Sequence, residues 1–210
     1  MTLRDISVTL RPGTPEWPGD TPYDCSWAWR IAAGDSVNVS TISGSPHVGT
    51  HADAPLHVRD GWAGAHELPL DAFVGPVWVS DVRGSSIEIS LDDLALPEGL
   101  PLSRLLLRTG QTIADGVFPD FWSSLSAQTI SALLARGVRL VGVDCPSVDL
   151  RDSKSLENHL VLFGGGCCVL ENLDLREVAA GAYELVAPPL KLEGVDAAPV
   201  RAILRDLPRA

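Results

Sequence analysis

The sequence predicts a strand-rich α/β fold, either a mixed sheet or a partly closed barrel, with a few flanking helices. Short apolar runs, several with alternating β-branched residues, recur along the chain and are typical of strands. Turn signals separate these runs at short intervals, because 16 prolines and 19 glycines are spread over 210 residues. Strands and helices do not alternate regularly, which argues against a doubly wound sheet or an eightfold barrel.

The strands are expected where these runs are most apolar. They are predicted at residues 5–10, 37–43, 77–82, 105–108, 140–144 and 183–190. Two short helices are also predicted, at residues 91–96 and 196–204.

A further helix is indicated by periodicity, because Ile130, Leu133 and Leu134 repeat at i, i+3 and i+4. A serine at position 124 or 126 can cap its start, and Gly137 can end it. A strand follows this glycine at once, so helix and strand are expected to be joined tightly.

The composition fits one domain that spans residues 1–210, with two small domains as a weaker option. A formal net charge of −11 argues against a nucleic-acid partner, which would need clustered Lys and Arg, and against an anionic membrane surface. No apolar run is long enough to span a membrane, and no signal peptide is visible. Four cysteines without C-x-x-C spacing fit reduced thiols, so a cytoplasmic location is expected.

The most unusual stretch is His-Val-Gly-Thr-His-Ala-Asp-Ala-Pro-Leu-His, residues 47–57, which holds three of the five histidines. Pro46, Gly49 and Pro55 oppose a helix there. In an extended chain the polar positions 47, 51, 53 and 57 are all odd, so their side chains point to one face. A straight strand would separate the outer histidines by about 33 Å. We therefore expect bends at Gly49 and Pro55 that bring the four side chains together.

A bound divalent metal is the simplest explanation for this convergence of His47, His51, Asp53 and His57. Without one, the buried groups would each need hydrogen-bond partners. Imidazole and carboxylate donors without a thiolate suit zinc, with manganese as a competitor. The alternative, surface polar groups beside a turn, would be favoured for a single histidine but not for three with an intervening aspartate. Glu171 stands in an apolar strand and also needs a partner, unless it faces solvent at a sheet edge.

The same stretch resembles the H-x-G-T-H-x-D-x-P-x-H motif of the metal-dependent cyclase-like hydrolases. Within that family, the chain is most similar to the bacterial kynurenine formamidases, over nearly its whole length. The further matching segments are residues 17–20, 142–149, 152–155, 170–173, 188–191 and 196–201, together with His159. One departure is Leu150, where the family often has proline after S-x-D. This change removes a turn-favouring residue but no ligand.

The resemblance implies a swivelling β/β/α-like fold, a homodimer, and a site for two divalent ions in each subunit. The implied metal ligands are His47, His51, Asp53, His159 and Glu171. Asp53 and Glu171 would bridge the two ions, and His57 would stay free as the acid/base. Taken alone, His159 would be interpreted as a structural histidine, and the family match makes it a ligand.

The function that follows from the resemblance is hydrolysis of N-formyl-L-kynurenine to L-kynurenine and formate in tryptophan degradation. Metal binding can lower the pKa of water to about 7, which supplies hydroxide, and a histidine can hand a proton to the leaving aniline nitrogen. His57 is expected to perform this transfer. The nearest alternative keeps the site but acts on isatin or another aryl or cyclic amide. An alternative of another class, a non-catalytic metal-stabilised module, predicts a closed coordination shell and no free base.

Several other residues are candidates for chemistry or binding. Trp17, between two prolines, could stack on an aryl substrate or pack as a lid over the core. Cys145 is interpreted as a small buried thiol rather than a nucleophile, and no G-x-S-x-G motif of a serine hydrolase occurs. The three glycines 164–166 lack the Lys-Ser/Thr of a phosphate loop, so they predict a turn. No role is predicted for His66, Cys167 or Cys168.

Overall fold

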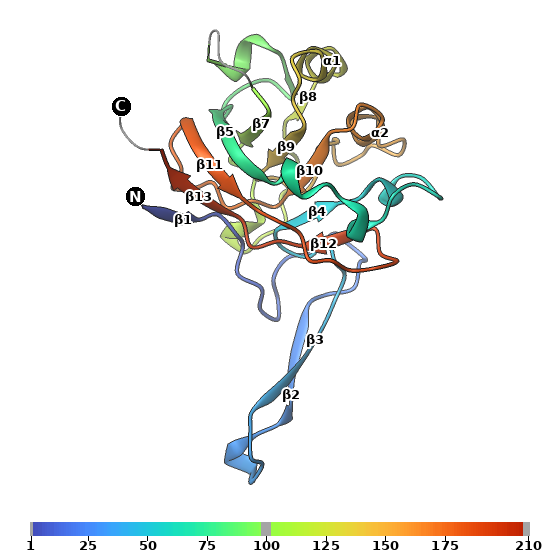
Figure 1. Ribbon diagram of the computed structural model, residues 1–210, viewed down its shortest axis with the longest axis vertical. Helices are drawn as coiled ribbons and strands as arrows, with labels where there is room; N and C mark the ends of the chain where they lie inside the picture. The colour runs from blue at the N-terminus through green and yellow to red at the C-terminus, as the bar shows by residue number, and fades with distance from the viewer. Residues whose placement is uncertain (1, 98–101, 208–210) are drawn as a thin grey trace.

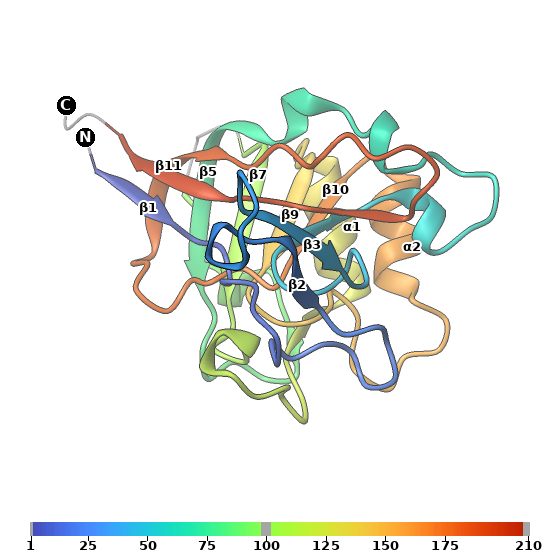
Figure 2. The same ribbon diagram turned by 90° about the horizontal axis from the view of Figure 1, so that it is seen from below.

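The computed structural model describes residues 2–97 and 102–207, and one curled, mixed sheet of nine strands forms its centre (Figures 1 and 2). In spatial order the strands are β1 (Leu3–Asp5), β13 (Ile203–Asp206), β11 (Gly181–Val186), β5 (Val74–Asp81), β7 (Arg104–Arg108), β9 (Leu140–Val143), β10 (Cys168–Glu171), β4 (His51–Asp53) and β12 (Ala197–Pro199). Strands β5, β7, β9 and β10 are parallel, and the outer pairings are antiparallel. The predicted strand-rich mixed sheet is confirmed.

Two helices and two small sheets complete the described part of the chain. The helices are α1 (Ala127–Ala135) and α2 (Glu157–Gly164), and the small sheets pair β2 (Asp24–Trp29) with β3 (Val39–Ser43) and β6 (Glu88–Ile89) with β8 (Ser124–Leu125). Short 3-10 turns lie at Ile31–Ala33, Pro55–His57, Ala65–Glu67, Leu70–Ala72, Asp92–Leu94 and Ile113–Asp115. Neither helix has the length and apolar character needed to cross a bilayer, as far as residues 2–97 and 102–207 show.

The central sheet is buried on both faces. In β7, Leu105 and Leu107 pack in one core cluster with Ile130 of α1, whereas Leu106 packs in a second cluster with Phe73. Alternation of successive side chains across a pleated strand produces this division. The two helices contact each other and belong to the first cluster, so they cover one face of the sheet (Figure 1).

Helix α1 confirms its predicted start and core face. The Ser126 hydroxyl accepts a hydrogen bond from the Thr129 backbone N–H at 3.2 Å, and Ile130 and Leu133 are fully buried. Gly137 follows the helix with φ = 84°, a conformation that favours glycine and ends the helix as predicted. Helix α2 is not foreseen by the sequence analysis, because Leu156 at its start offers no capping side chain.

Both of the short predicted helices need correction. Residues 196–204 do not form a helix, because β12 pairs with β4 and β13 pairs with β1 and β11. Ala197 and Ala198 are fully buried in this pairing, so tertiary packing overrides their helix propensity. The helix predicted at residues 91–96 is a single 3-10 turn at Asp92–Leu94. The first and last predicted strands are also displaced, to β1 and β11, while the four between them coincide with β3, β5, β7 and β9 within a few residues.

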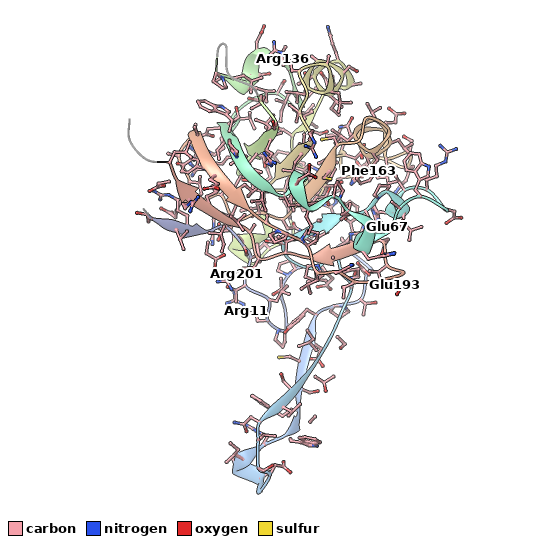
Figure 3. All side chains as sticks on the ribbon, viewed as in Figure 1. Arg11, Glu67, Arg136, Phe163, Glu193 and Arg201 are labelled. Atoms are coloured by element: carbon pink, nitrogen blue, oxygen red, sulfur yellow. The ribbon has the colours of Figure 1, made fainter. Side chains whose placement is uncertain are left out.

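Strands β2 and β3 form a hairpin arm that stands out from the body of the protein (Figures 1 and 3). Every residue of both strands is exposed, and the ribbon is irregular between Trp27 and Trp29. The chain enters the arm after residue 20 and returns from it just before His47. Both ends of the arm therefore join the region that holds the histidine motif.

Candidate metal centre and its cleft

Strand pairing sets three of the expected ligand side chains beside one another. In the antiparallel pair of β4 and β10, Glu171 lies opposite His51, and Val169 lies opposite Asp53. The intervening Ala52 packs into the core on the other face of the sheet. Because side chains alternate along a strand, His51, Asp53 and Glu171 share one face, and all three are buried.

The chain bends on either side of β4, as the sequence analysis expects. Gly49 has φ = 72°, and a Cβ atom there would lie 2.5 Å from Leu10 Cδ2, so the position suits only glycine. Pro55 opens the 3-10 turn that ends at His57. These bends bring the His47 ring within 4.9 Å of the His51 ring and 4.4 Å of the His57 ring, measured between centroids.

Two groups of ligand atoms result from this arrangement. In the first, His47 Nδ1 lies 3.0 Å and His51 Nε2 lies 3.1 Å from Asp53 Oδ1, and the two nitrogens are 3.2 Å apart. In the second, His159 Nε2 lies 3.1 Å from Asp53 Oδ2 and 3.3 Å from Glu171 Oε1. Asp53 belongs to both groups, and the second oxygen of Glu171 lies 3.6 Å from His51 Nε2.

Hydrogen bonds on the far side of each ring fix which nitrogen bears a lone pair. His51 Nδ1 donates to the Gly49 carbonyl at 2.9 Å, His47 Nε2 to Asp196 at 2.9 Å, and His159 Nδ1 to Asp149 at 2.6 Å. The opposite nitrogen of each neutral ring then presents a lone pair to the carboxylates of the centre. Lone pairs at such distances repel one another unless a cation lies among them.

The Asp53 side chain provides a second test of whether a cation fits. Its Oδ1 atom is buried and accepts no hydrogen bond, although two imidazole nitrogens lie within 3.1 Å. A buried carboxylate oxygen needs a partner of positive charge. The donor set of three imidazoles and two carboxylates, without a thiolate, matches zinc and also suits manganese. The residues present therefore fit a centre for divalent cations.

The shifted pKa values of these groups also show that the centre favours positive charge. Burial disfavours the charged form of His47, but its contacts with the carboxylates of Asp196 and Asp53 outweigh burial and raise the pKa of the ring to about 10. Burial likewise opposes protonation of His159, while hydrogen bonds to Asp149 and Asp53 raise its pKa well above the ordinary value. Burial would raise the pKa of Asp53, but the surrounding histidines hold it well below its usual range. A proton and a metal ion thus compete for the same positions.

His57 is placed differently from the other histidines of the motif. Its Nδ1 atom lies 3.2 Å from Asp196 Oδ2, and its side chain is 28% exposed. One of its ring nitrogens still lies within 4.8 Å of ligand atoms of Asp53 and His159. His57 therefore stands at the solvent side of the centre, next to the groups that would bind metal.

Two carboxylates in the centre have no role in the sequence analysis. Asp149 accepts hydrogen bonds from the backbone N–H groups of Asn158 and His159, so it caps α2 while it also orients the His159 ring. Asp196 binds His47 and His57 across more than 130 residues of chain. Both residues lie in segments that resemble the metal-dependent cyclase-like hydrolases. Their spacing from the histidines gives no local signal, so only that match could have indicated them.

A cleft of about 390 Å³ opens above the centre. His47, His51, His57, His159 and Glu171 form part of its lining. Trp17 and Phe118 contribute an aromatic wall, and their rings meet edge to face with centroids 5.6 Å apart. Trp17 also contacts the buried Trp122 ring, with centroids 5.8 Å apart. Both interpretations of Trp17, as a cleft residue and as a packing residue, are thus compatible with its position.

The remaining candidates lie outside the chemistry of the cleft. Cys145 is fully buried, and burial raises the pKa of its thiol well above the ordinary value, so it is not a poised nucleophile. All four cysteines are free thiols, and burial raises the pKa of Cys167 and of Cys168 to about 12. His66 lies on the 3-10 turn Ala65–Glu67 and does not line the cleft. Residues 164–166 end α2 in a turn, as predicted.

A family model and several solved structures match this chain. The family model named Cyclase, described as "Putative cyclase", matches residues 4–150. The structure of a "Potential Metal-Dependent Hydrolase With Cyclase Activity" is similar with a TM-score of 0.83 and 29% identity, over 99% of each chain. A "predicted metal-dependent hydrolase from Bacillus stearothermophilus" is similar with a TM-score of 0.81 and 29% identity, over 97% of each chain.

A third similar structure is isatin hydrolase A from Labrenzia aggregata, bound to benzyl benzoate. Its TM-score is 0.78 and its identity 25%, over 97% of this chain and 93% of that chain. The family model covers more than half of the sequence, and the solved structures have a fold similar to that of this chain. This chain therefore belongs to the cyclase family.

Proposed function

We propose that this chain is a metal-dependent amidohydrolase that converts N-formyl-L-kynurenine and water to L-kynurenine and formate. The observation that carries the proposal is the convergence of lone-pair atoms below an aromatic-walled cleft, with one histidine held beside them. The proposed metal ligands are His47, His51, Asp53, His159 and Glu171. Asp53 and Glu171 would be shared by the two ions, because each lies close to histidines of both groups.

The proposed cofactors are two divalent cations in each subunit, zinc in the first place and manganese in the second. When bound, such ions make water a stronger acid and polarise a carbonyl oxygen. The protein holds the ligand atoms in place through outer hydrogen bonds from Asp149, Asp196 and the Gly49 carbonyl. Such outer partners fix the orientation and basicity of the ligand rings.

His57 is the proposed acid/base. Its Nδ1 atom is hydrogen-bonded to Asp196, so Nε2 is left to exchange protons with the reactants. Hydrolysis of a formamide needs one proton removed from the attacking water and one delivered to the leaving aniline nitrogen. A histidine at the solvent side of the centre can do both in turn. This placement also disfavours a non-catalytic module, which would need no base beside its metal ligands.

The lining of the cleft suggests which amide it accepts. Trp17 and Phe118 supply aromatic surface for an aryl ring. The charged side chains of Lys154, Glu16 and Asp20 also line the cleft. N-formyl-L-kynurenine carries both an aryl formamide and an amino-acid group with one positive and one negative charge. A lining with both signs of charge favours this substrate over a neutral one.

Isatin is the second candidate substrate, and the similarity to isatin hydrolase A favours it. The same cleft and centre would open its cyclic amide with the same base. Isatin, however, is neutral and gives the charged lining no partner.

Formate release from N-formyl-L-kynurenine, measured beside ring opening of isatin on metal-loaded protein, tests the proposal. We expect a higher kcat/KM for N-formyl-L-kynurenine. A preference for isatin would replace the proposed substrate, and full metal loading without hydrolysis of either amide would support the non-catalytic module.

A Lys154→Met variant sharpens the test of the substrate. Loss of an exposed ion pair should raise KM for N-formyl-L-kynurenine about two- to fivefold. Formanilide, an aryl formamide without the amino-acid group, serves as the control, and its KM should stay unchanged. An equal rise for both substrates would assign Lys154 a structural role.

A further inference from the structure

Asp196 is held in place by the pairing of β12 with β4. Ala197 lies opposite Asp53 in this pair, and the Ala54 backbone N–H donates to the Asp196 carbonyl at 2.8 Å. The carbonyl of the preceding residue, Val195, accepts a hydrogen bond from the Ala65 backbone N–H at 3.0 Å. The backbone of Asp196 is therefore fixed beside the segment that leads from Asp53 to His57.

One oxygen of the Asp196 side chain joins two histidines of different proposed roles. Oδ2 accepts hydrogen bonds from His47 Nε2 at 2.9 Å and from His57 Nδ1 at 3.2 Å. The two rings lie 4.4 Å apart between centroids, so they are also in contact with each other. Among residues 2–97 and 102–207, Asp196 is the only carboxylate that is hydrogen-bonded to the His57 ring.

These two hydrogen bonds select one tautomer for each ring. His47 must carry its proton on Nε2, which leaves Nδ1 for the first group of ligand atoms. His57 must carry its proton on Nδ1, which leaves Nε2 as the atom that can take a proton from a reactant. Without the carboxylate, a solvent-exposed imidazole would populate both tautomers and rotate more freely.

We propose that Asp196 is a positioning residue that orients the acid/base His57 and ties its orientation to the metal ligand His47. This inference rests on the proposed function of the centre. Asp196 itself touches neither group of ligand atoms around Asp53, so it acts through the two histidines. The coupling would keep the base aligned only while the first ligand group is intact.

Three variants test this role. Asp196→Asn retains the size of the side chain but removes its charge, and Asp196→Ala removes both hydrogen bonds. Glu193→Gln, which removes one charge from an exposed residue at the edge of the body (Figure 3), is the matched control. The measurements are metal content, kcat and KM, and the nitrogen-15 chemical shifts of the His57 ring in the metal-loaded protein.

In the presence of excess metal, we expect both Asp196 variants to reach the full metal content and to lose about 10- to 100-fold in kcat, with little change in KM. In the native protein and in Glu193→Gln, the His57 shifts should report a proton on Nδ1. In Asp196→Ala they should report a mixture of tautomers.

Two results would overturn the inference. Loss of metal in proportion to activity, even with excess metal, would make Asp196 a ligand, together with His47 and His57. Unchanged kcat and unchanged His57 shifts would show that the contacts have no positioning role. The ring shifts need no substrate, so they decide the inference even if the native protein hydrolyses neither candidate amide. Absence of hydrolysis of both amides would contradict the proposed function but not the positioning role of Asp196.

Discussion

The metal centre and the β2–β3 arm have opposite relations to solvent. At the centre, the residues His51, Asp53 and His159 are at most 1% exposed, whereas Trp27 and Trp29 on the arm are 53% and 56% exposed. Burial of polar groups and exposure of large apolar groups both cost free energy unless a partner compensates. We therefore expect each region to bind a partner, a cation at the centre and an apolar surface at the arm.

The largest expected effect is at Asp53, which belongs to both groups of ligand atoms. Asp53→Asn should abolish binding of both metal ions, and hydrolysis should fall below detection, because the variant loses the negative charge that the two groups share. Metal analysis of the purified variant, beside His159→Ala, provides the comparison. His159→Ala should lose one ion only, and equal loss in both variants would argue against two separate positions.

The second largest effect is expected at His57, which is proposed as the acid/base and not as a metal ligand. His57→Ala should retain nearly all metal but lose about 100- to 10,000-fold in kcat, as expected for removal of a general acid/base. Metal content and formate release are measured on the same preparation. A parallel loss of metal would make His57 a ligand instead.

Proton competition at the centre gives a third prediction. His47 in the metal-free protein has a pKa raised to about 10, so its proton must leave before a metal ion binds at Nδ1. Apparent metal affinity should therefore rise with pH, about tenfold per pH unit for each proton displaced, up to pH 10. Calorimetric titration in two buffers of different ionisation enthalpy measures the protons released. Release of no proton at pH 7 would contradict the assigned contacts.

The same shift governs the free energy of unfolding of the metal-free protein. Because the pKa of His47 is raised above its unfolded value, its contribution to stability is complete below about pH 6.5 and is lost as the pH rises towards 10. Metal-loaded protein should not show this loss, and denaturant titrations of both forms across that range compare them.

The smallest effect on the centre is expected from the arm. The homodimer remains a prediction from the family resemblance, and the arm is the surface we expect it to bury, because Trp27, Trp29 and Ile42 are exposed there. The double variant Trp27→Ser and Trp29→Ser should lower the mass in solution from two chains to one while metal content stays the same. Sedimentation analysis measures this change. An unaltered dimer would exclude the arm as its main contact.

The sequence was most informative where structure depends on near neighbours. The Ser126 cap and the repeat of Ile130 and Leu133 identified α1, and the odd positions of the histidine motif with bends at Gly49 and Pro55 anticipated its shape. Each of these signals lies within about ten residues of chain. Alternating apolar runs also located most of the central strands, because both faces of the sheet are buried.

Structure that depends on distant segments was not accessible in this way. Helix α2 is capped by Asp149, eight residues before the helix begins, rather than by a residue at its start. Residues 196–204 have helix-compatible alanines, yet pairing with β4 makes Ala197 and Ala198 part of a strand. Asp196 meets His47 and His57 only because of that pairing, so its contacts could not be inferred from spacing.

The metal content of the purified native protein, determined together with formate release from N-formyl-L-kynurenine, tests the central claim most directly. We expect two divalent ions per chain, loss of formate release after treatment with a chelator, and recovery of activity when zinc or manganese is restored. Undiminished hydrolysis by protein that contains no metal would contradict the account.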